Sequence, residues 1–466
     1  MTVTRLDAVA AAARYFDRGA FRDDLAALVA RPSPSQTPDS LRGLQDYLDD
    51  AIAAPLAALG FDGTLHDNPV AGAGPLLVAR RHEDDDRPTV LIYGHGDTVA
   101  GQDERWRDTL SPWTLIERDG RYYGRGTADN KGQHWINIAA LRTVIETRGK
   151  LGFNVTLLLE SDEEMGSRGL GAFCDAHRDL LAADVLIASD GPRLDPARAT
   201  VVLGSRGLQN FRLRVHLREG AHHSGNWGGL LADPGTILAH ALASLTDARG
   251  AITVPEWRPT SLTGNVRALF AGLDPSGGPG APAIDPDWGE PGLSAAERVY
   301  GWNSFAVLAL ASGDPARPQN AIQPSAEAVC QLRYVVGTDP DDILPALRRH
   351  LDAHGFTAVE IVPVASSGMR ATRSDADNPW VRRTLASIEA TLGAPPALVP
   401  NIGGSIPNDV FAELLGLPTV WIPHSYAGCA QHAPDEHMLT AVAREALMLM
   451  AGLFWDIGAD GRQSDI

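Results

Sequence analysis

Hydrophobic and polar positions follow two different patterns along the chain, and these patterns predict two kinds of sheet. Short continuous apolar runs are typical of strands buried on both faces, as in a parallel sheet covered by helices. The four runs are Thr89–Tyr93, Val155–Leu159, Asp184–Ala188 and Thr419–Ile422. Helical patterns lie between them, and residues 38–59 carry Leu and Ile at spacings of three and four. We therefore expect an α/β domain with a mostly parallel sheet covered by helices.

The middle of the chain has a different pattern. Residues 211–217 and 328–334 alternate apolar and polar side chains, as half-exposed strands do. Residues 271–292 are rich in Gly and Pro and predict a long loop. We therefore predict an inserted α+β domain over residues 204–363. It interrupts the α/β domain, whose two parts are then residues 1–203 and 364–466.

The charge and the cysteines narrow the class of protein. The 466 residues include 40 Lys and Arg against 58 Asp and Glu, so the formal net charge is −18. Such an acidic chain is poorly suited to nucleic acid or to an anionic membrane surface. Three widely separated cysteines, Cys174, Cys330 and Cys429, argue against a disulfide framework and favour the cytoplasm. No run of about 18 apolar residues predicts a membrane span, and the charged N-terminus does not resemble a signal peptide.

Histidine and acidic side chains follow three of the four apolar runs directly. His95 and Asp97 follow the first run, and Asp190 follows the third. Glu163 and Glu164 follow the second. Ligands of open α/β sheets bind beyond the carboxyl ends of the strands, so we expect these side chains to meet at one edge. Imidazole nitrogens and carboxylate oxygens suit zinc, and also cobalt or manganese.

Two further segments complete a set of five motifs. They are residues 124–132 (GRGTADNKG) and 431–437 (QHAPDEH). In this order the motifs resemble the M20 family of metallopeptidases, which includes carnosine-type dipeptidases, glutamate carboxypeptidases, aminoacylases and deacylases of N-acyl amino acids. The resemblance extends from Leu28 to His437. It implies a catalytic α/β domain with an inserted lid or dimerisation domain, and a homodimer formed through the insertion.

The resemblance also implies two divalent metal ions, most simply Zn²⁺, with Co²⁺ or Mn²⁺ as alternatives. His95 and Asp190 would bind one ion, and Glu164 and His432 the other. Asp129 would bridge the two. Two ions carry four positive charges, which three carboxylates and one bridging hydroxide balance. Metal ions about 3.5–4 Å apart lower the pKa of bound water and polarise an amide carbonyl.

Three further side chains receive catalytic roles from the same resemblance. Asp97 would accept the second ring N–H of His95 and fix its tautomer. Glu163, beside the ligand Glu164, would be the general base that moves a proton from the metal-bound water to the leaving amine. His223, in a His-Ser-Gly motif, would reach the active site of the partner subunit and stabilise the oxyanion.

The expected substrate is a dipeptide or an N-acyl amino acid with a free carboxylate. Asn320 and Arg333 resemble the family residues that grip the substrate, and a guanidinium suits bidentate binding of a carboxylate. Gly404 and Ser405 belong to a glycine-rich loop that would line the pocket. Asn401 stands where many carnosine-type relatives have Arg, so the carboxylate contact at this spot departs from the family pattern.

Other assignments compete for some of these positions. His424 and His437 compete with His432 as the histidine ligand, and His222 competes with His223. Asp129 would also suit the cap of a following helix. The family pattern favours His432 and His223.

Two alternative functions remain open from the sequence. The same site would suit hydrolysis of a non-peptide C–N bond, as in a ureide or an aromatic amine. A non-catalytic binding protein on this scaffold would be expected to lack a ligand or the base, and none is missing here. The sequence has no His-Glu-x-x-His, Gly-x-Ser-x-Gly, P-loop or Gly-x-Gly-x-x-Gly motif, which argues against other hydrolases and nucleotide enzymes.

Overall fold

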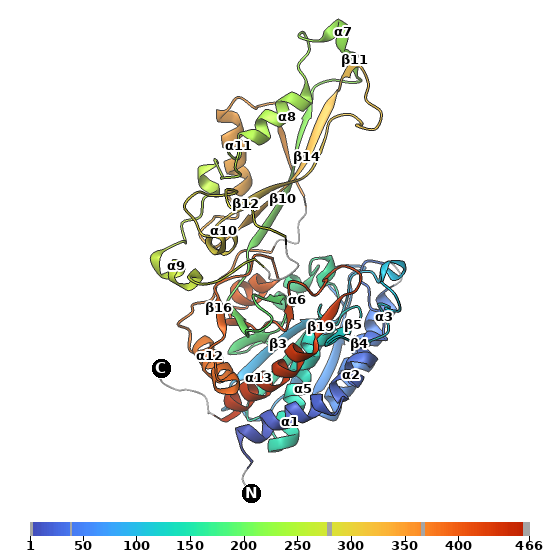
Figure 1. Ribbon diagram of the computed structural model, residues 1–466, viewed down its shortest axis with the longest axis vertical. Coiled ribbons are helices and arrows are strands. Elements are labelled where there is room, and N and C mark those ends of the chain that lie inside the picture. The colour runs from blue at the N-terminus through green and yellow to red at the C-terminus, as the bar shows by residue number, and fades with distance from the viewer. Residues whose placement is uncertain (1–2, 38–39, 277–281, 365–368, 460–466) are drawn as a thin grey trace.

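The computed structural model describes residues 3–37, 40–276, 282–364 and 369–459 (Figure 1). An eight-stranded sheet with helices forms the lower part in Figure 1, and a four-stranded sheet forms the elongated upper part. From edge to edge, the large sheet contains β1 (Asp62–His66), β2 (Leu76–Arg81), β6 (Asn154–Glu160), β3 (Thr89–His95), β7 (Val185–Ala188), β17 (Thr419–Trp421), β9 (Thr200–Val202) and β16 (Ala397–Val399).

The centre of the large sheet is parallel. β3 pairs with β6 and β7, and β7 pairs with β17, all in parallel register. β16 and β9 are parallel too, whereas β1, β2 and β6 pair antiparallel at one edge. The four continuous apolar runs of the sequence are thus β3, β6, β7 and β17, and the predicted mostly parallel sheet is confirmed.

Helices cover both faces of this sheet, which explains the continuous apolar runs. Val90 and Ile92 of β3 lie in the core on one face, while Leu91 and Tyr93 lie in a second core on the other. The first core contains residues of α1 (Arg5–Asp17), α2 (Ala20–Val29), α5 (Lys131–Arg148), α12 (Pro379–Leu392) and α13 (Thr440–Ala459). The second contains residues of α6 (Leu170–Ala176), η5 (Val410–Leu414), α9 (Gly264–Phe270) and α10 (Ala295–Tyr300).

The helix expected over residues 38–59 is present where the structure describes it. It consists of α3 (Leu41–Asp46), a π-helical segment η1 (Tyr47–Ala53) and α4 (Ala54–Ala58). Residues 38–39 lie outside the described residues. The π-helical segment was not predicted, because π-helical turns are rare and occur mostly as short bulges inside α-helices.

The upper part contains an antiparallel sheet in the order β12 (Ser304–Ala311), β14 (Ser325–Tyr334), β10 (Gly207–His216) and β15 (Glu360–Pro363). Helices α8 (Pro234–Ala243) and α11 (Ile343–Ala353) share a core with β10 and β14. Burial alternates along β14, as its sequence predicts. The boundaries 204–363 for the insertion stay a prediction. Of the expected loop 271–292, residues 277–281 lie outside the described part and the others form no helix or strand.

Short elements occur in both parts, and several of them carry motif residues. The small sheets pair β11 (His222–His223) with β13 (Ala321–Ile322), β8 (Pro192–Arg193) with β18 (Ser425–Tyr426), and β4 (Ile116–Arg118) with β5 (Arg121–Tyr123) and β19 (His437–Leu439). The short helices are η2 (Asp103–Arg105), η3 (Glu163–Met165), α7 (Ser224–Trp227) and η4 (Pro255–Trp257). None of the helices in the described residues is long and apolar enough to span a membrane.

Candidate metal centre

The candidate site lies at the carboxyl ends of three neighbouring parallel strands. β6, β3 and β7 are adjacent in the large sheet. His95 is the last residue of β3, Glu163 and Glu164 begin the helix η3 after β6, and Asp190 follows β7. Asp129 stands two residues before α5. The cap of α5 is Asn130, so the expectation that Asp129 caps this helix is wrong.

One group of potential ligands contains His95, Asp129 and Asp190. Each side chain offers one ligand atom, and these atoms all lie within 4.8 Å of one another. His95 Nε2 is 2.9 Å from Asp129 Oδ1 and 3.6 Å from Asp190 Oδ2. All three residues are buried, so a cation placed between them is held largely out of water.

A second group contains Asp129, Glu164 and His432, again with ligand atoms within 4.8 Å of one another. His432 Nε2 is 3.0 Å from both Asp129 Oδ2 and Glu164 Oε2. Asp129 therefore belongs to both groups and turns one oxygen towards each. The structure brings together the five side chains that the resemblance implies, in the same pairing.

The chemistry of this cluster fits divalent cations. Burial raises the pKa of Asp190 to about 6, and the neighbouring Asp129 charge adds to the effect. Burial likewise raises the pKa of Glu164 to about 7 and that of Glu163 well above its ordinary value. Glu164 Oε1 is buried without a hydrogen-bond partner among the described residues. Ionised carboxylates that are buried close together repel one another, and an unpaired oxygen adds to the cost of their burial. A cation between them offsets both effects.

Asp97 connects the first ligand to the segment that carries the general-base candidate. Its Oδ1 lies 3.3 Å from His95 Nδ1, and its two oxygens accept the backbone N–H groups of Glu163 at 3.2 Å and Glu164 at 3.1 Å. The side chain is fully buried. Asp97 is therefore placed to orient the His95 ring and the start of η3 together.

The competing histidines have other partners. His437 Nε2 lies 2.6 Å from the Tyr426 hydroxyl, and its Nδ1 lies 2.9 Å from the Asp435 carbonyl oxygen. His424 Nε2 lies 3.1 Å from Ser189 Oγ. In the described part of the chain, neither histidine belongs to a group of potential metal ligands.

Glu436 is a residue of the site that the sequence analysis did not single out. Its carboxylate accepts a 2.8 Å hydrogen bond from Arg125 and backbone hydrogen bonds of 2.9–3.0 Å from Gly126, Ala128 and Asp129. It thus joins the loop that carries His432 to the loop that carries Asp129. The only signal in the sequence was its place four residues after His432.

The predicted substrate contacts lie in two places. Arg333 Nη1 donates to Ser405 Oγ at 3.2 Å, and Gly404 and Ser405 line the pocket that contains the metal groups. His223 and Asn320 lie together instead, since β11 pairs with β13 and Ser224 N–H donates to the Asn320 carbonyl. Figure 1 shows β11 at the far tip of the upper part, so within one chain these two residues do not meet the metal groups.

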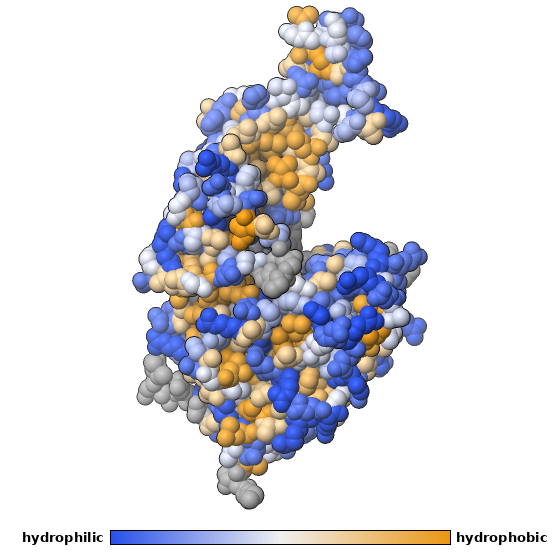
Figure 2. Space-filling model, in the orientation of Figure 1, coloured by the Kyte–Doolittle hydropathy of each residue, from blue (hydrophilic) through white to orange (hydrophobic). Residues whose placement is uncertain are grey.

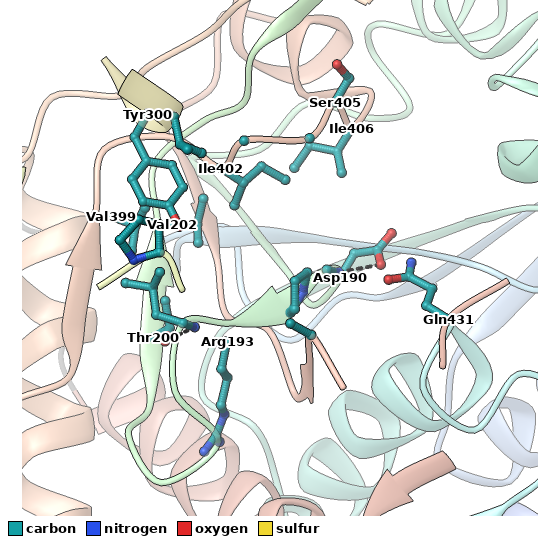
Figure 3. A pocket seen from close by; sticks show the side chains of 18 of the residues that line it. Asp190, Arg193, Thr200, Val202, Tyr300, Val399, Ile402, Ser405, Ile406 and Gln431 are labelled. Carbon is teal, nitrogen blue, oxygen red and sulfur yellow. Dashed lines mark hydrogen bonds between the residues drawn. The ribbon is translucent and has the colours of Figure 1, made fainter. Parts of the chain in front are cut away.

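A pocket of about 400 Å³ opens onto both groups (Figure 3). Glu163 lines it together with Asp129, Asp190 and His432. Its volume is at the lower end of the range for small-molecule sites, which suits a compact substrate.

Comparisons with known proteins place the chain in a peptidase family. The model of peptidase family M20/M25/M40 matches residues 91–456. The chain is 30% identical over 405 residues to a cysteinylglycine-S-conjugate dipeptidase of Corynebacterium striatum, covering 83% of this chain and 84% of the relative. It is 37% identical over 186 residues to a Beta-Ala-His dipeptidase of Mus musculus, covering 39% and 37%.

Solved structures show the same fold. An M20 family metallo-carboxypeptidase from Sulfolobus solfataricus gives a TM-score of 0.78 at 23% identity, covering 94% of this chain and 99% of that one. Human carnosine dipeptidase 1 gives 0.75 at 23% identity, covering 97% and 100%. The fold and site thus define a metallopeptidase. The chain belongs to peptidase family M20/M25/M40, and the resemblance seen in the motifs is confirmed.

Proposed function

We propose that this protein is a dinuclear metal-dependent dipeptidase. The observation that carries the proposal is the pair of three-residue ligand groups that share Asp129, with Glu163 beside them in one pocket. Two similar relatives are named as dipeptidases, which favours a dipeptide over an N-acyl amino acid or another C–N compound. Zn²⁺ is the proposed metal because both groups combine imidazole and carboxylate ligands. The three free, buried cysteines support a cytoplasmic location.

His95, Asp129 and Asp190 would hold one ion, and Asp129, Glu164 and His432 the other. Such a pair of ions, when bound, lowers the pKa of water and polarises the amide carbonyl. Glu163 would take the proton of the attacking water on a carboxylate oxygen and pass it to the leaving amine nitrogen. The raised pKa of this carboxyl, caused first by burial, helps it to hold that proton during the transfer.

Other residues of the chain would position the substrate. Arg333 and Ser405 are 3.2 Å apart, and together they would hold the free carboxylate of the dipeptide. Asp97 would keep the His95 ring in one tautomer. His223 of the partner subunit would stabilise the oxyanion, and Asn320 lies close enough to His223 to enter the same site with it.

An exposed apolar edge strand supports the proposed homodimer. β12 lies at the edge of its sheet, and Val307, Leu308 and Leu310 on it are 44%, 54% and 57% exposed. Figure 2 shows a hydrophobic area over this sheet. An exposed apolar edge strand is typical of a strand that pairs with another chain. Leu308→Lys should therefore shift the sedimentation of the protein from dimer to monomer, whereas an unchanged sedimentation coefficient would contradict this interface.

The test of the proposed function is Glu163→Gln with Glu146→Gln as a matched control. Glu146 is exposed on α5, away from the pocket. Metal-loaded Glu163→Gln should retain its metal, measured by elemental analysis, and lose about 10²- to 10⁴-fold in kcat on dipeptides. The control should match the wild type. Wild-type turnover by Glu163→Gln would show that the base is assigned wrongly.

A further inference from the structure

The pocket continues from the metal groups into a chamber lined by apolar side chains. Aliphatic and aromatic residues form this part of the wall, and they come from β9, β16, α10 and the glycine-rich loop. They are Val202, Val299, Tyr300, Val399, Ile402 and Ile406. Figure 3 shows Tyr300, Val202, Val399 and Ile402 together on one side, with Asp190 and Gln431 on the other. The polar metal end and the apolar end therefore belong to one space.

The charged side chains that line the apolar end offer no buried partner to a group bound in this chamber. Arg193 lines the pocket, but its side chain turns away in Figure 3 and its guanidinium pairs with Glu445 at 2.7 Å. Asp274 also lines the pocket near Tyr300, but its side chain is exposed and stays hydrated. The Thr200 hydroxyl is already bonded to backbone groups of Leu194 and Arg198. Among the described lining residues, no buried charge faces the chamber beyond the metal groups.

Asn401 explains how this apolar end is held in place. Its side chain is buried. Its Nδ2 donates to the Tyr300 carbonyl at 2.8 Å, and its Oδ1 accepts from Arg373 at 3.3 Å. The side chain therefore fixes the end of α10, with Tyr300, against the glycine-rich loop. It adds no charge to the chamber.

We propose that this chamber binds an apolar side chain, branched aliphatic or aromatic, of one residue of the substrate. The proposal rests on the proposed dipeptidase function and narrows its substrate class. A charged side chain would lose its hydration in the chamber and find no buried partner of opposite charge there, which is unfavourable. An apolar side chain gains by leaving water in proportion to the area it buries.

Two series of dipeptides test the proposal, X-Gly and Gly-X, with X as Leu, Phe, Ser, Asp or Lys. In one of the series, kcat/KM for Leu or Phe should exceed that for Ser by about 10-fold and that for Asp or Lys by about 100-fold. Equal or higher values for Ser, Asp or Lys in both series would overturn the proposal. Absence of hydrolysis of every dipeptide would instead contradict the dipeptidase function.

A binding experiment further distinguishes failure of the chamber proposal from failure of the dipeptidase proposal. Calorimetric titration of metal-loaded Glu163→Gln with the same dipeptides measures affinity without turnover. Tighter binding of the Leu and Phe members supports the chamber even if hydrolysis fails, and equal affinities across the series would overturn it.

A matched pair of variants tests whether the chamber causes the preference for apolar side chains. Ile402→Thr keeps the branched shape but adds a hydroxyl to the chamber wall, and it should reduce the preference for Leu over Ser about fivefold. Ile361→Thr makes the same change in β15, outside the pocket, and should leave the preference unchanged. If both variants keep the wild-type preference, or both lose it equally, the chamber does not set the specificity. Circular dichroism confirms that each variant is folded.

Discussion

Removing the Glu436 carboxylate should weaken both the fold and the metal affinity. The side chains of Glu436 and Arg125 are each 1% exposed, and the carboxylate also accepts three backbone N–H groups of residues 126–129. Removing one partner of a buried ion pair costs about 3–5 kcal/mol of stability, because the other charge is then buried without a partner. Glu436→Ala should therefore have a free energy of unfolding lower than that of the wild type by an amount in this range. Glu436→Gln, which keeps an acceptor, should lose less.

The effect on metal binding follows from the residues that Glu436 holds. It fixes the backbone of Asp129, which is shared by both ligand groups. Loss of a group that orients metal ligands typically lowers affinity about 10- to 100-fold. Glu83→Ala is the matched control. The Glu83 carboxylate likewise accepts from Arg81 and from the backbone of residues 151 and 152, but it lies at the opposite end of β6 from the ligands.

Urea unfolding in chelator and again in excess Zn²⁺ measures both quantities, because the added stability reports the metal affinity. For Glu436→Ala, the stability gained from Zn²⁺ should fall by about 1.4–3 kcal/mol, which corresponds to the 10- to 100-fold loss. Glu83→Ala should lose stability in chelator and keep the full gain from Zn²⁺. The reasoning is refuted if Glu436→Ala unfolds like the wild type, or if both variants lose the metal-dependent gain equally.

Three further predictions concern the metals, the substrate carboxylate and one buried acid. Chelation should abolish hydrolysis and added Zn²⁺, Co²⁺ or Mn²⁺ should restore it; activity that survives chelation would contradict the metal centre. Arg333→Met should raise KM about 10- to 100-fold for dipeptides but not for their C-terminal amides, and an equal change for both would exclude a carboxylate contact. Burial raises the pKa of Glu160 to about 8, so its contribution to stability is present below about pH 4.5 and is lost as the pH rises through 8. In chelator, wild-type stability should therefore fall between pH 5 and pH 9 relative to Glu160→Gln; parallel pH profiles in urea unfolding would contradict this pKa.

The sequence predicted the centre of the fold because burial on both faces leaves a direct mark on composition. The runs that became β3, β6, β7 and β17 are continuously apolar, since helices cover both sides of them. Residues such as His95 and Asp190 were visible as candidates because they end such runs. The pairing of the ligands came from the resemblance of the motifs to a known family.

Only the tertiary structure showed how distant segments meet. Glu436 bonds to a loop more than 300 residues earlier in the chain, and no local pattern marks an acceptor of such distant N–H groups. Tyr300 reaches the chamber from the middle of the chain, and Asn401 turns towards its carbonyl instead of the pocket. These contacts depend on loops and helix ends packed across the sheet. By itself the sequence thus determined the strands and the types of ligand, because both depend on residues close together in the chain. Long-range packing decided which residues support the site and what shape the chamber has.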